Sequence, residues 1–441
     1  MDAAAKLAET DEPRSGRDWT PYSIYALAFL TLISSLNYLD RSILGLALPK
    51  IKAEMHVSDL VLGLVSGLLF AAFYSLMGIP VAWLADRWNR RNIIAIGLFF
   101  WSLMTLATGF VANIWQLAAC RLLMGAGEAA GLAPSNSLLS DLFRKARRPL
   151  ALAILAIASS ISSILYFPII GRIGDAHGWR AMFVAAGLPG VVLALIFMLT
   201  VKEPPRTGAS GEATRLPAPP LGVAIRFLAG SRAYLLMLLG VMLMGANLWS
   251  ASAWNPSFLA RVHHMTMTQV ADVLGPIRGV LGAAGILLGG VLIDRMGKRD
   301  PRWRLRIPAI ACLLAGPAEL MFLMGDNKAV WFTGLAGATL FSLVHQPPVY
   351  AAAMNVAQPR LRALAVALIL MVAGLFGQVV GPAMVGFLND QLAPAFGPMA
   401  IRYSMLIIAV TPVLAAAAFW AASAFVETDG LRAEQADGAR G

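Results

Sequence analysis

The sequence predicts an all-α membrane protein with twelve transmembrane helices in two six-helix halves. The first observation behind this prediction is composition. The chain of 441 residues is 58% hydrophobic and only 13% charged, whereas a soluble domain carries about 25% charged residues. So few charges cannot cover the water-facing surface of a globule of this size, and a polytopic helical membrane protein is the simplest alternative.

The second observation is a charged loop that occurs twice. The stretch Ala82–Arg91 ends a long apolar run with an acid and finishes with adjacent bases, and Gly290–Arg299 repeats this pattern about half a chain later. The acids are Asp86 and Asp294. Two such loops at corresponding places indicate a duplicated membrane protein.

A membrane-crossing helix needs ~20 predominantly apolar residues. Along the first half this rule predicts helices at 22–48, 58–84, 92–111, 114–139, 149–173 and 179–201. Along the second half it predicts helices at 232–259, 270–293, 303–325, 328–355, 361–388 and 398–426. Residues 202–221 are rich in Pro, Gly, Ala and charge, as linkers are. The predicted domains are therefore an N-terminal half (1–201), a cytoplasmic linker (202–221) and a C-terminal half (222–441).

Basic clusters lie in alternate loops, which predicts that this side is cytoplasmic and that both termini are too. The net charge of +11 therefore does not point to a nucleic-acid partner. Residues 1–20 contain no apolar core before a small-residue cleavage site, so no cleavable signal peptide is expected. Cys120 and Cys312 lie inside apolar runs and imply no disulfide framework. Short loops and alanine-rich helices fit a bacterial inner membrane protein.

Four of the charges inside the predicted membrane spans stand out: Asp40 and Arg41 on the first helix, and Arg121 and Glu128 on the fourth. An ionised side chain near the bilayer centre costs at least ~2.5–3.5 kcal/mol, so it is a functional hypothesis by default. Arg121 and Glu128 are almost two turns apart and share one helix face. Counting the helix rise from each end places Asp40 and Arg121 at similar depth.

An acid beside a movable base suits proton coupling. A carboxylate near an arginine keeps its charge, whereas one facing a dry apolar wall prefers the proton. If two conformations exchange these environments, proton binding is coupled to the motion. The alternative is a satisfied structural network that only fixes helix register.

Further candidates could line a central cavity: Asn37, Tyr38, Trp249, Trp254, Arg278 and His345. Each of the last four has an alternative. Tryptophans at helix ends are commonly interface anchors, Arg278 could snorkel to the membrane surface, and His345 precedes two prolines and could pack at a broken helix. Glu319 is expected near the interface.

An enzyme would need a nucleophile–base or metal constellation facing one cavity. The five histidines lie in separate spans and loops, and no His-Glu-x-x-His run exists. We therefore expect no enzyme, no metal site and no cofactor, with protons as the coupling ion.

The duplicated loop resembles the cytoplasmic-loop signature of the major facilitator superfamily. Arg121-Leu-Leu-Met-Gly-Ala-Gly resembles its fourth-helix signature, and Glu203-Pro-Pro-Arg206 resembles the usual end of its sixth helix. Within the superfamily, Asn37-Tyr-Leu-Asp-Arg41, Gly125-Ala-Gly-Glu128-Ala and Trp254-Asn-Pro-Ser-Phe-Leu259 look most like the spinster family. The chain departs from the loop signature at Ala82 and Asn89, where glycines are usual.

The resemblance implies a secondary transporter whose two halves rock about a central site. Spinster relatives move amphiphiles such as lysophospholipids and sphingosine phosphates, some with proton coupling. Carried over, Asp40, Arg41, Arg121 and Glu128 become the proton- and substrate-linked set. A cytoplasmic gate is expected from the loop residues, which are Asp86, Arg87, Arg90, Arg91, Asp294 and Arg295. Each acid would close the gate at the N-terminus of a helix from the other half.

The sequence therefore predicts a proton-coupled transporter of amphiphilic, lipid-like molecules, acting as a monomer in the bilayer. Two alternatives stay open within transport: a symporter of small organic anions and a multidrug exporter. The sequence does not give the direction of transport, the headgroup or the chain length.

Overall fold

The computed structural model describes residues 19–144, 146–205 and 221–438, and every regular element in these ranges is a helix. The elements from Pro21 to Thr200 are α2 (Pro21–Met55), α3 (Asp59–Ser66), α4 (Leu68–Arg87), α5 (Arg90–Thr108), α6 (Ile114–Glu128), α7 (Leu132–Leu142), α8 (Arg148–Ala156), α9 (Ala158–Ile161), the π-helix η1 (Ser162–Tyr166), α10 (Phe167–His177) and α11 (Trp179–Thr200).

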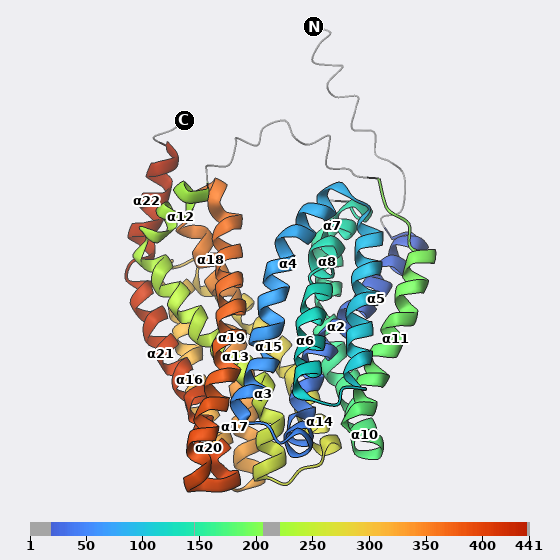
Figure 1. The fold of residues 1–441 in the computed structure, drawn as a ribbon. Helices are drawn as coiled ribbons and strands as arrows, with labels where there is room; N and C mark the ends of the chain where they lie inside the picture. The colour runs from blue at the N-terminus through green and yellow to red at the C-terminus, as the bar shows by residue number, and fades with distance from the viewer. Residues whose placement is uncertain (1–18, 145, 206–220, 439–441) are drawn as a thin grey trace.

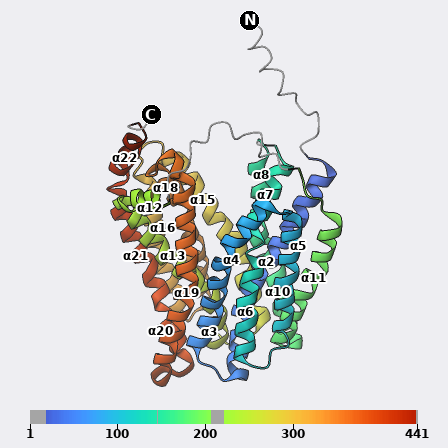
Figure 2. The same cartoon turned by 45° about the horizontal axis from the view of Figure 1, so that its top comes forward.

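The elements after the linker are α12 (Leu221–Ala229), α13 (Arg232–Val262), α14 (Met267–Pro276), the π-helix η3 (Ile277–Leu281), α15 (Gly282–Met296), α16 (Trp303–Met324), α17 (Lys328–Val344), α18 (Gln346–Asn355), the short 3₁₀-helix η4 (Pro359–Leu361), α19 (Arg362–Phe396), a second 3₁₀-helix η5 (Gly397–Met399), α20 (Ala400–Ser404), α21 (Leu406–Ser423) and α22 (Val426–Gly438). Figures 1 and 2 show the helices before the linker on one side of the molecule and α13, α19 and α21 on the other.

Several predicted spans are broken where the sequence analysis expected one continuous helix. The second span is divided into α3, which ends at Ser66, and α4, which begins at Leu68. The break falls at Gly67, whose backbone departs from ideal helix geometry. The fifth and eighth spans each contain a π-helical segment, η1 and η3, which inserts an extra residue per turn. Apolar composition predicts that a segment crosses the membrane, but it does not predict such local breaks.

The count of twelve stays a prediction. Nine stretches of the described residues are long and apolar enough to cross a membrane, and one of them, Pro359–Ser423, covers both of the last two expected helices. The expected fourth and tenth spans are divided into shorter helices at 114–142 and 328–355. The linker prediction falls mostly on residues 206–220, outside the described residues, and α12 begins at its last position.

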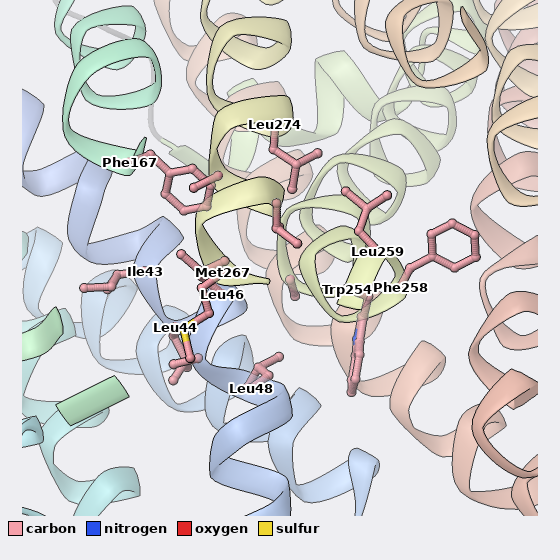
Figure 3. Close-up of a cluster of buried hydrophobic side chains, with 14 of the residues drawn as sticks. Ile43, Leu44, Leu46, Leu48, Phe167, Trp254, Phe258, Leu259, Met267 and Leu274 are labelled. Carbon is pink, nitrogen blue, oxygen red and sulfur yellow. The ribbon is translucent and has the colours of Figure 1, made fainter. Parts of the chain in front are cut away.

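The two ends of the bundle differ. We call the end that carries the α4–α5 and α15–α16 loops, with Arg87 and Lys298, the basic end. The end that carries the α2–α3 and α13–α14 loops is the far end. The largest apolar core cluster joins the halves near the far end, because α2 contributes Ile43 and Leu46 while α13 contributes Trp254 (Figure 3).

Glycines along α4 and α19 show where the halves touch. A Cβ added at Gly67 would lie closer than 3.0 Å to the carbonyl oxygen of Gln378, so the backbones are in direct contact there. Gly78 lies three turns nearer the basic end on the same face of the helix, and Gly374 lies one turn nearer the basic end than Gln378. A Cβ at either glycine would meet nothing within 4 Å. The halves are therefore packed together at the far end and apart toward the basic end.

Candidate functional site

The four predicted intramembrane charges meet inside the N-terminal half. The Arg41 Nε on α2 donates to the Glu128 Oε2 on α6 at 2.8 Å. The Arg41 side chain is 19% exposed, whereas the Glu128 side chain is fully buried. Arg41 therefore keeps contact with the space between the halves while its partner does not.

Two aromatic rings of α4 complete the surroundings of Arg41. Its guanidinium lies 5.1 Å from the ring centre of Phe70 and 4.9 Å from that of Tyr74, and the two rings stack on each other. Such faces attract a cation where water is scarce. Arg41 is thus held by a carboxylate and by two rings.

Asp40 and Arg121 lie at the same depth, as predicted, but their carboxylate and guanidinium do not form the ion pair. The Arg121 Nη1 donates to the backbone carbonyl oxygen of Asp40 at 3.2 Å. Both side chains are buried, and the Asp40 Oδ1, the Arg121 Nε and the Glu128 Oε1 have no hydrogen-bond partner in the described structure. A charged cluster that is partly unsatisfied is a poor structural device, because unpaired buried polar groups are costly.

Two small hollows border Arg41. One, of ≈ 20 Å³, lies between the halves against Arg121, Trp249 and Gln378. The other, of ≈ 50 Å³, lies within the N-terminal half against Asn37, Tyr38 and Glu128. Each has room for water-sized groups, so both faces of the Arg41–Glu128 pair can be hydrated.

The predicted cavity residues divide into two groups. Asn37, Tyr38 and Trp249 line the hollows. Trp254 and His345 do not. Trp254 is fully buried and donates its Nε1–H to the carbonyl oxygen of Pro382 at 2.9 Å. His345 is buried at the junction of α17 and α18, where its Nδ1 lies 2.6 Å from the carbonyl oxygen of Ser342.

Arg278 lies on η3 and does not snorkel to the surface. Its Nη2 donates to the carbonyl oxygen of Ala251 at 3.1 Å, and its guanidinium lies 6.0 Å from the ring centre of Phe167 in the other half. Glu319 lies five residues before the end of α16 at Met324 and is 4% exposed, so it is buried within the protein, and its position at the membrane interface stays a prediction.

Sequence reasoning missed three residues that shape the site: Phe70, Tyr74 and Gln378. Phe70 and Tyr74 are four residues apart and share a helix face, which is a readable signal. Gln378 is a polar residue within a long apolar run, and a polar residue in such a place is itself a signal of a candidate site residue.

At the basic end, Asp86 and Asp294 are exposed, as are Arg87 and Arg295. The guanidinium of Arg87 lies 4.2 Å from the ring centre of its neighbour Trp83. These four residues lie in the last turn of α4 and of α15, at the basic end.

Arg90 and Arg91 lie elsewhere than the predicted gate surface. Arg90 is 2% exposed and is ion-paired inside the N-terminal half with Asp141 of α7 and, at 2.6 Å, with Glu203 after α11. The backbone N–H of Arg91 donates to the other Glu203 oxygen at 2.9 Å. These two arginines fasten three segments of one half together.

Comparisons with known proteins agree with this architecture. The family model of the major facilitator superfamily matches residues 30–382. An MFS-type efflux pump of Mycolicibacterium smegmatis is 30% identical over 433 residues, which cover 97% of this chain and 98% of the relative. Protein spinster homolog 1 of Homo sapiens is 28% identical, with 93% of this chain and 83% of the relative covered.

Solved structures give the same result. A bacterial homolog of the human lysosomal transporter spinster, in an inward-facing and occupied conformation, is 26% identical, with a TM-score of 0.80 over 93% of this chain and 99% of that one. The nucleoside transporter NupG, 17% identical with a TM-score of 0.75 over 91% of this chain and 99% of that one, shares the fold. The chain is a multi-pass membrane protein that belongs to the major facilitator superfamily, and it is a transporter of the spinster type.

Proposed function

We propose that this protein is a proton-coupled transporter of amphiphiles with an anionic headgroup, of the lysophospholipid or sphingoid type. It works by alternating access in a bacterial inner membrane, with the basic end facing the cytoplasm. The present conformation is then the inward-open one.

The observation that carries this proposal is the ion pair between Arg41 and Glu128. Arg41 is the partly exposed member and Glu128 the buried one, so an anion between the halves reaches Arg41 first. When a phosphate or carboxylate binds Arg41, the buried Glu128 carboxylate loses its cationic partner and takes up a proton. Substrate and proton then bind together, which is symport.

The walls of the site support an amphiphilic substrate. Arg41 and Arg121 provide two cations on one side of the space between the halves, while Leu44, Trp249 and Pro382 provide apolar surface beside them. A headgroup on the arginines would place its chain along that surface. A small hydrophilic anion would leave the apolar surface unused.

The relatives also support a second candidate. The Mycolicibacterium smegmatis relative is named an efflux pump, which favours export of amphiphilic compounds. Asp86 and Asp294 serve in either case as acids that close the basic end by binding the N-terminus of a helix in the opposite half.

Uptake of labelled lysophospholipid into proteoliposomes, with and without an inward proton gradient, tests the proposal. We expect Glu128→Gln to reduce the gradient-driven rate at least tenfold, because glutamine cannot exchange the proton. Exchange of lysolipid without a gradient should survive, since Arg41 stays available. Glu319→Gln is the matched control: it removes another buried carboxyl, in the other half and away from Arg41, and should leave the gradient dependence unchanged.

Three results would contradict the proposal. Gradient-independent uptake by the parent protein would remove the proton coupling. Absence of uptake for every amphiphile tried, with uptake of small organic anions, would favour the small-anion symporter. Efflux of amphiphilic drugs without lysolipid movement would favour the exporter.

A further inference from the structure

At the far end, an acid of each half binds the start of a helix in the other half. The carboxylate of Asp390, near the end of α19, accepts the backbone N–H of Asp59 at 2.9 Å on one oxygen and that of Leu60 at 2.8 Å on the other. These are the first two residues of α3. The third residue, Val61, donates its N–H to the side chain of Ser58 at 3.2 Å.

The other pair of helices repeats this arrangement. The carboxylate of Asp175, near the end of α10, accepts the N–H of Met267 at 3.1 Å and that of Thr268 at 2.8 Å. These residues begin α14. The third residue, Gln269, donates its N–H to the side chain of Thr266 at 3.3 Å.

The correspondence extends to sequence position and backbone contact. Ser58 and Thr266 are separated by the same number of positions as the loop acids Asp86 and Asp294, so both belong to the duplicated unit. A glycine precedes each capping acid by four residues, Gly386 before Asp390 and Gly171 before Asp175. A Cβ at either glycine would lie closer than 3.0 Å to the carbonyl oxygen of the first residue of the capped helix.

These contacts are suited to holding the halves together. The first turn of a helix has N–H groups without an intrahelical partner, and the helix dipole favours an anion there. In each case the helix and its acid belong to different halves. When the halves separate at the far end, both carboxylates and four backbone N–H groups lose their partners at once.

The contact made by Asp390 is reinforced by ion pairs to Asp59, the first residue of the capped helix. Arg261 of α13 donates from both terminal nitrogens to the two oxygens of Asp59, each at 2.8 Å, and Lys52 approaches the same carboxylate at 2.7 Å. Asn389 also donates to it. The corresponding residue on the other side is Met267, which has no charge.

We propose that Asp175 and Asp390 are the gate residues of the far end, and that they form two corresponding latches which close the exit opposite the basic end. This inference rests on the proposed alternating access, and it adds to that proposal the residues that hold the inward-open state. The Asp390 latch is the stronger one because Asp59 brings Arg261 to it.

The interface contains a matched control. Arg172 of α10 and Asp272 of α14 form an ion pair across the same boundary at 3.0 Å, but their side chains are 57% and 42% exposed. Exposed pairs of this kind contribute little. Asp272→Ala therefore removes an acid from the same interface without removing a helix cap.

A single cysteine at Leu46 reports on the latch. Leu46 is 2% exposed and lies in the apolar cluster between the halves near the far end (Figure 3). With Cys120 and Cys312 replaced by serine, a membrane-impermeant maleimide added at the far side of proteoliposomes labels Leu46→Cys when that end opens. We expect Asp390→Ala and Asp175→Ala each to accelerate labelling about fivefold, corresponding to the ~1 kcal/mol of a lost helix cap, and Asp272→Ala less than twofold.

Asp390→Glu keeps the charge, so this variant should label more slowly than Asp390→Ala. Cooperative unfolding of each variant on heating is the control that the protein is folded. Equal labelling rates in Asp390→Ala, Asp175→Ala and Asp272→Ala would overturn the latch. The readout needs neither a lipid substrate nor a proton gradient. A failure of lysolipid uptake with latch-dependent labelling would therefore overturn only the proposed substrate, and normal uptake with unchanged labelling would overturn only the latch.

Discussion

Arg90 illustrates how a residue can match a signature and still act away from the expected surface. The loop pattern places it among gate residues, yet its guanidinium lies buried between Asp141 and Glu203 and also donates to the hydroxyl of Ser137 at 3.0 Å. Its contacts join α5, α7 and the segment after α11. At this position Arg90 and Arg91 hold one half in shape, whereas the acid Asp86 is exposed.

We predict that Arg90→Ala lowers the free energy of unfolding by about 3 kcal/mol, because removing one partner of a buried ion pair leaves its carboxylates uncompensated. Arg91→Ala should cost far less, since the contact from Arg91 to Glu203 uses the backbone N–H and survives the substitution. Thermal unfolding in detergent measures both. Equal losses for the two variants would mean that the buried network around Arg90 is not the source of stability.

At the site, the sequence predicted which residues meet but not how they pair. Helix rise and direction were enough to place Asp40 and Arg121 at one depth. The ion pair between Arg41 and Glu128 depends on rotation of α2 about its axis, which determines that Arg41 rather than Asp40 faces Glu128. The hydropathy of this helix carries little information on rotation, because the helix is apolar on most of its surface.

At the scale of helices, small residues decide where the two halves can touch. Gly63 and Gly67 of the second span pack directly on the backbone of α19 at Pro382 and Gln378, while Gly78 faces open space. The four-residue spacing of Gly63 and Gly67 is typical of close helix packing. It could not tell which half the glycines face, since a packing motif has no information on its partner.

We predict that Gly63→Ala accelerates labelling of the Leu46→Cys reporter from the far side, because the added methyl group would lie closer than 3.0 Å to the carbonyl oxygen of Pro382. That group is backbone and cannot rotate away. Gly78→Ala is the control, since nothing lies within 4 Å of its added Cβ, and it should not accelerate labelling. Acceleration by both alanines would indicate a general loosening of the second span rather than a clash between the halves.

The π-helical breaks in the fifth and eighth spans also lie where the two halves touch. The π-helices η1 and η3 face each other across the halves, where the Ser160 hydroxyl donates to the carbonyl oxygen of Gly279 at 3.0 Å. A Cβ at Gly275 would lie closer than 3.0 Å to the carbonyl oxygen of Ser163. Such segments are rare single-turn bulges inside α-helices, so composition predicts the span but not the break. This is why the sequence predicted where apolar helices lie better than it predicted whether each helix is continuous.

For the whole molecule, the two proposed closures use the same two pairs of membrane spans in opposite directions, the second with the eleventh and the fifth with the eighth. At the far end, acids on α10 and α19 bind the first turns of α14 and α3. At the basic end, Asp86 and Asp294 lie at the ends of α4 and α15, and the N-cap residues of α8 and α19, Arg147 and Leu361, make no side-chain cap. Closing the basic end would give those two helix starts an acid from the other half, while the far-end caps would be lost.

This exchange predicts opposite effects for the two acids of one helix pair. Asp86→Asn weakens the closure proposed for the basic end, so it should favour the present conformation and slow labelling of the Leu46→Cys reporter from the far side. Asp390→Ala should accelerate that labelling. Because the substituted residues lie at opposite ends and share no partner, their effects should add, and the double variant should label at close to the parental rate. Faster labelling in the Asp86→Asn variant than in the parent, or in the double variant than in Asp390→Ala, would contradict the exchange. It would mean that Asp86 stabilises the closed far end rather than the closed basic end.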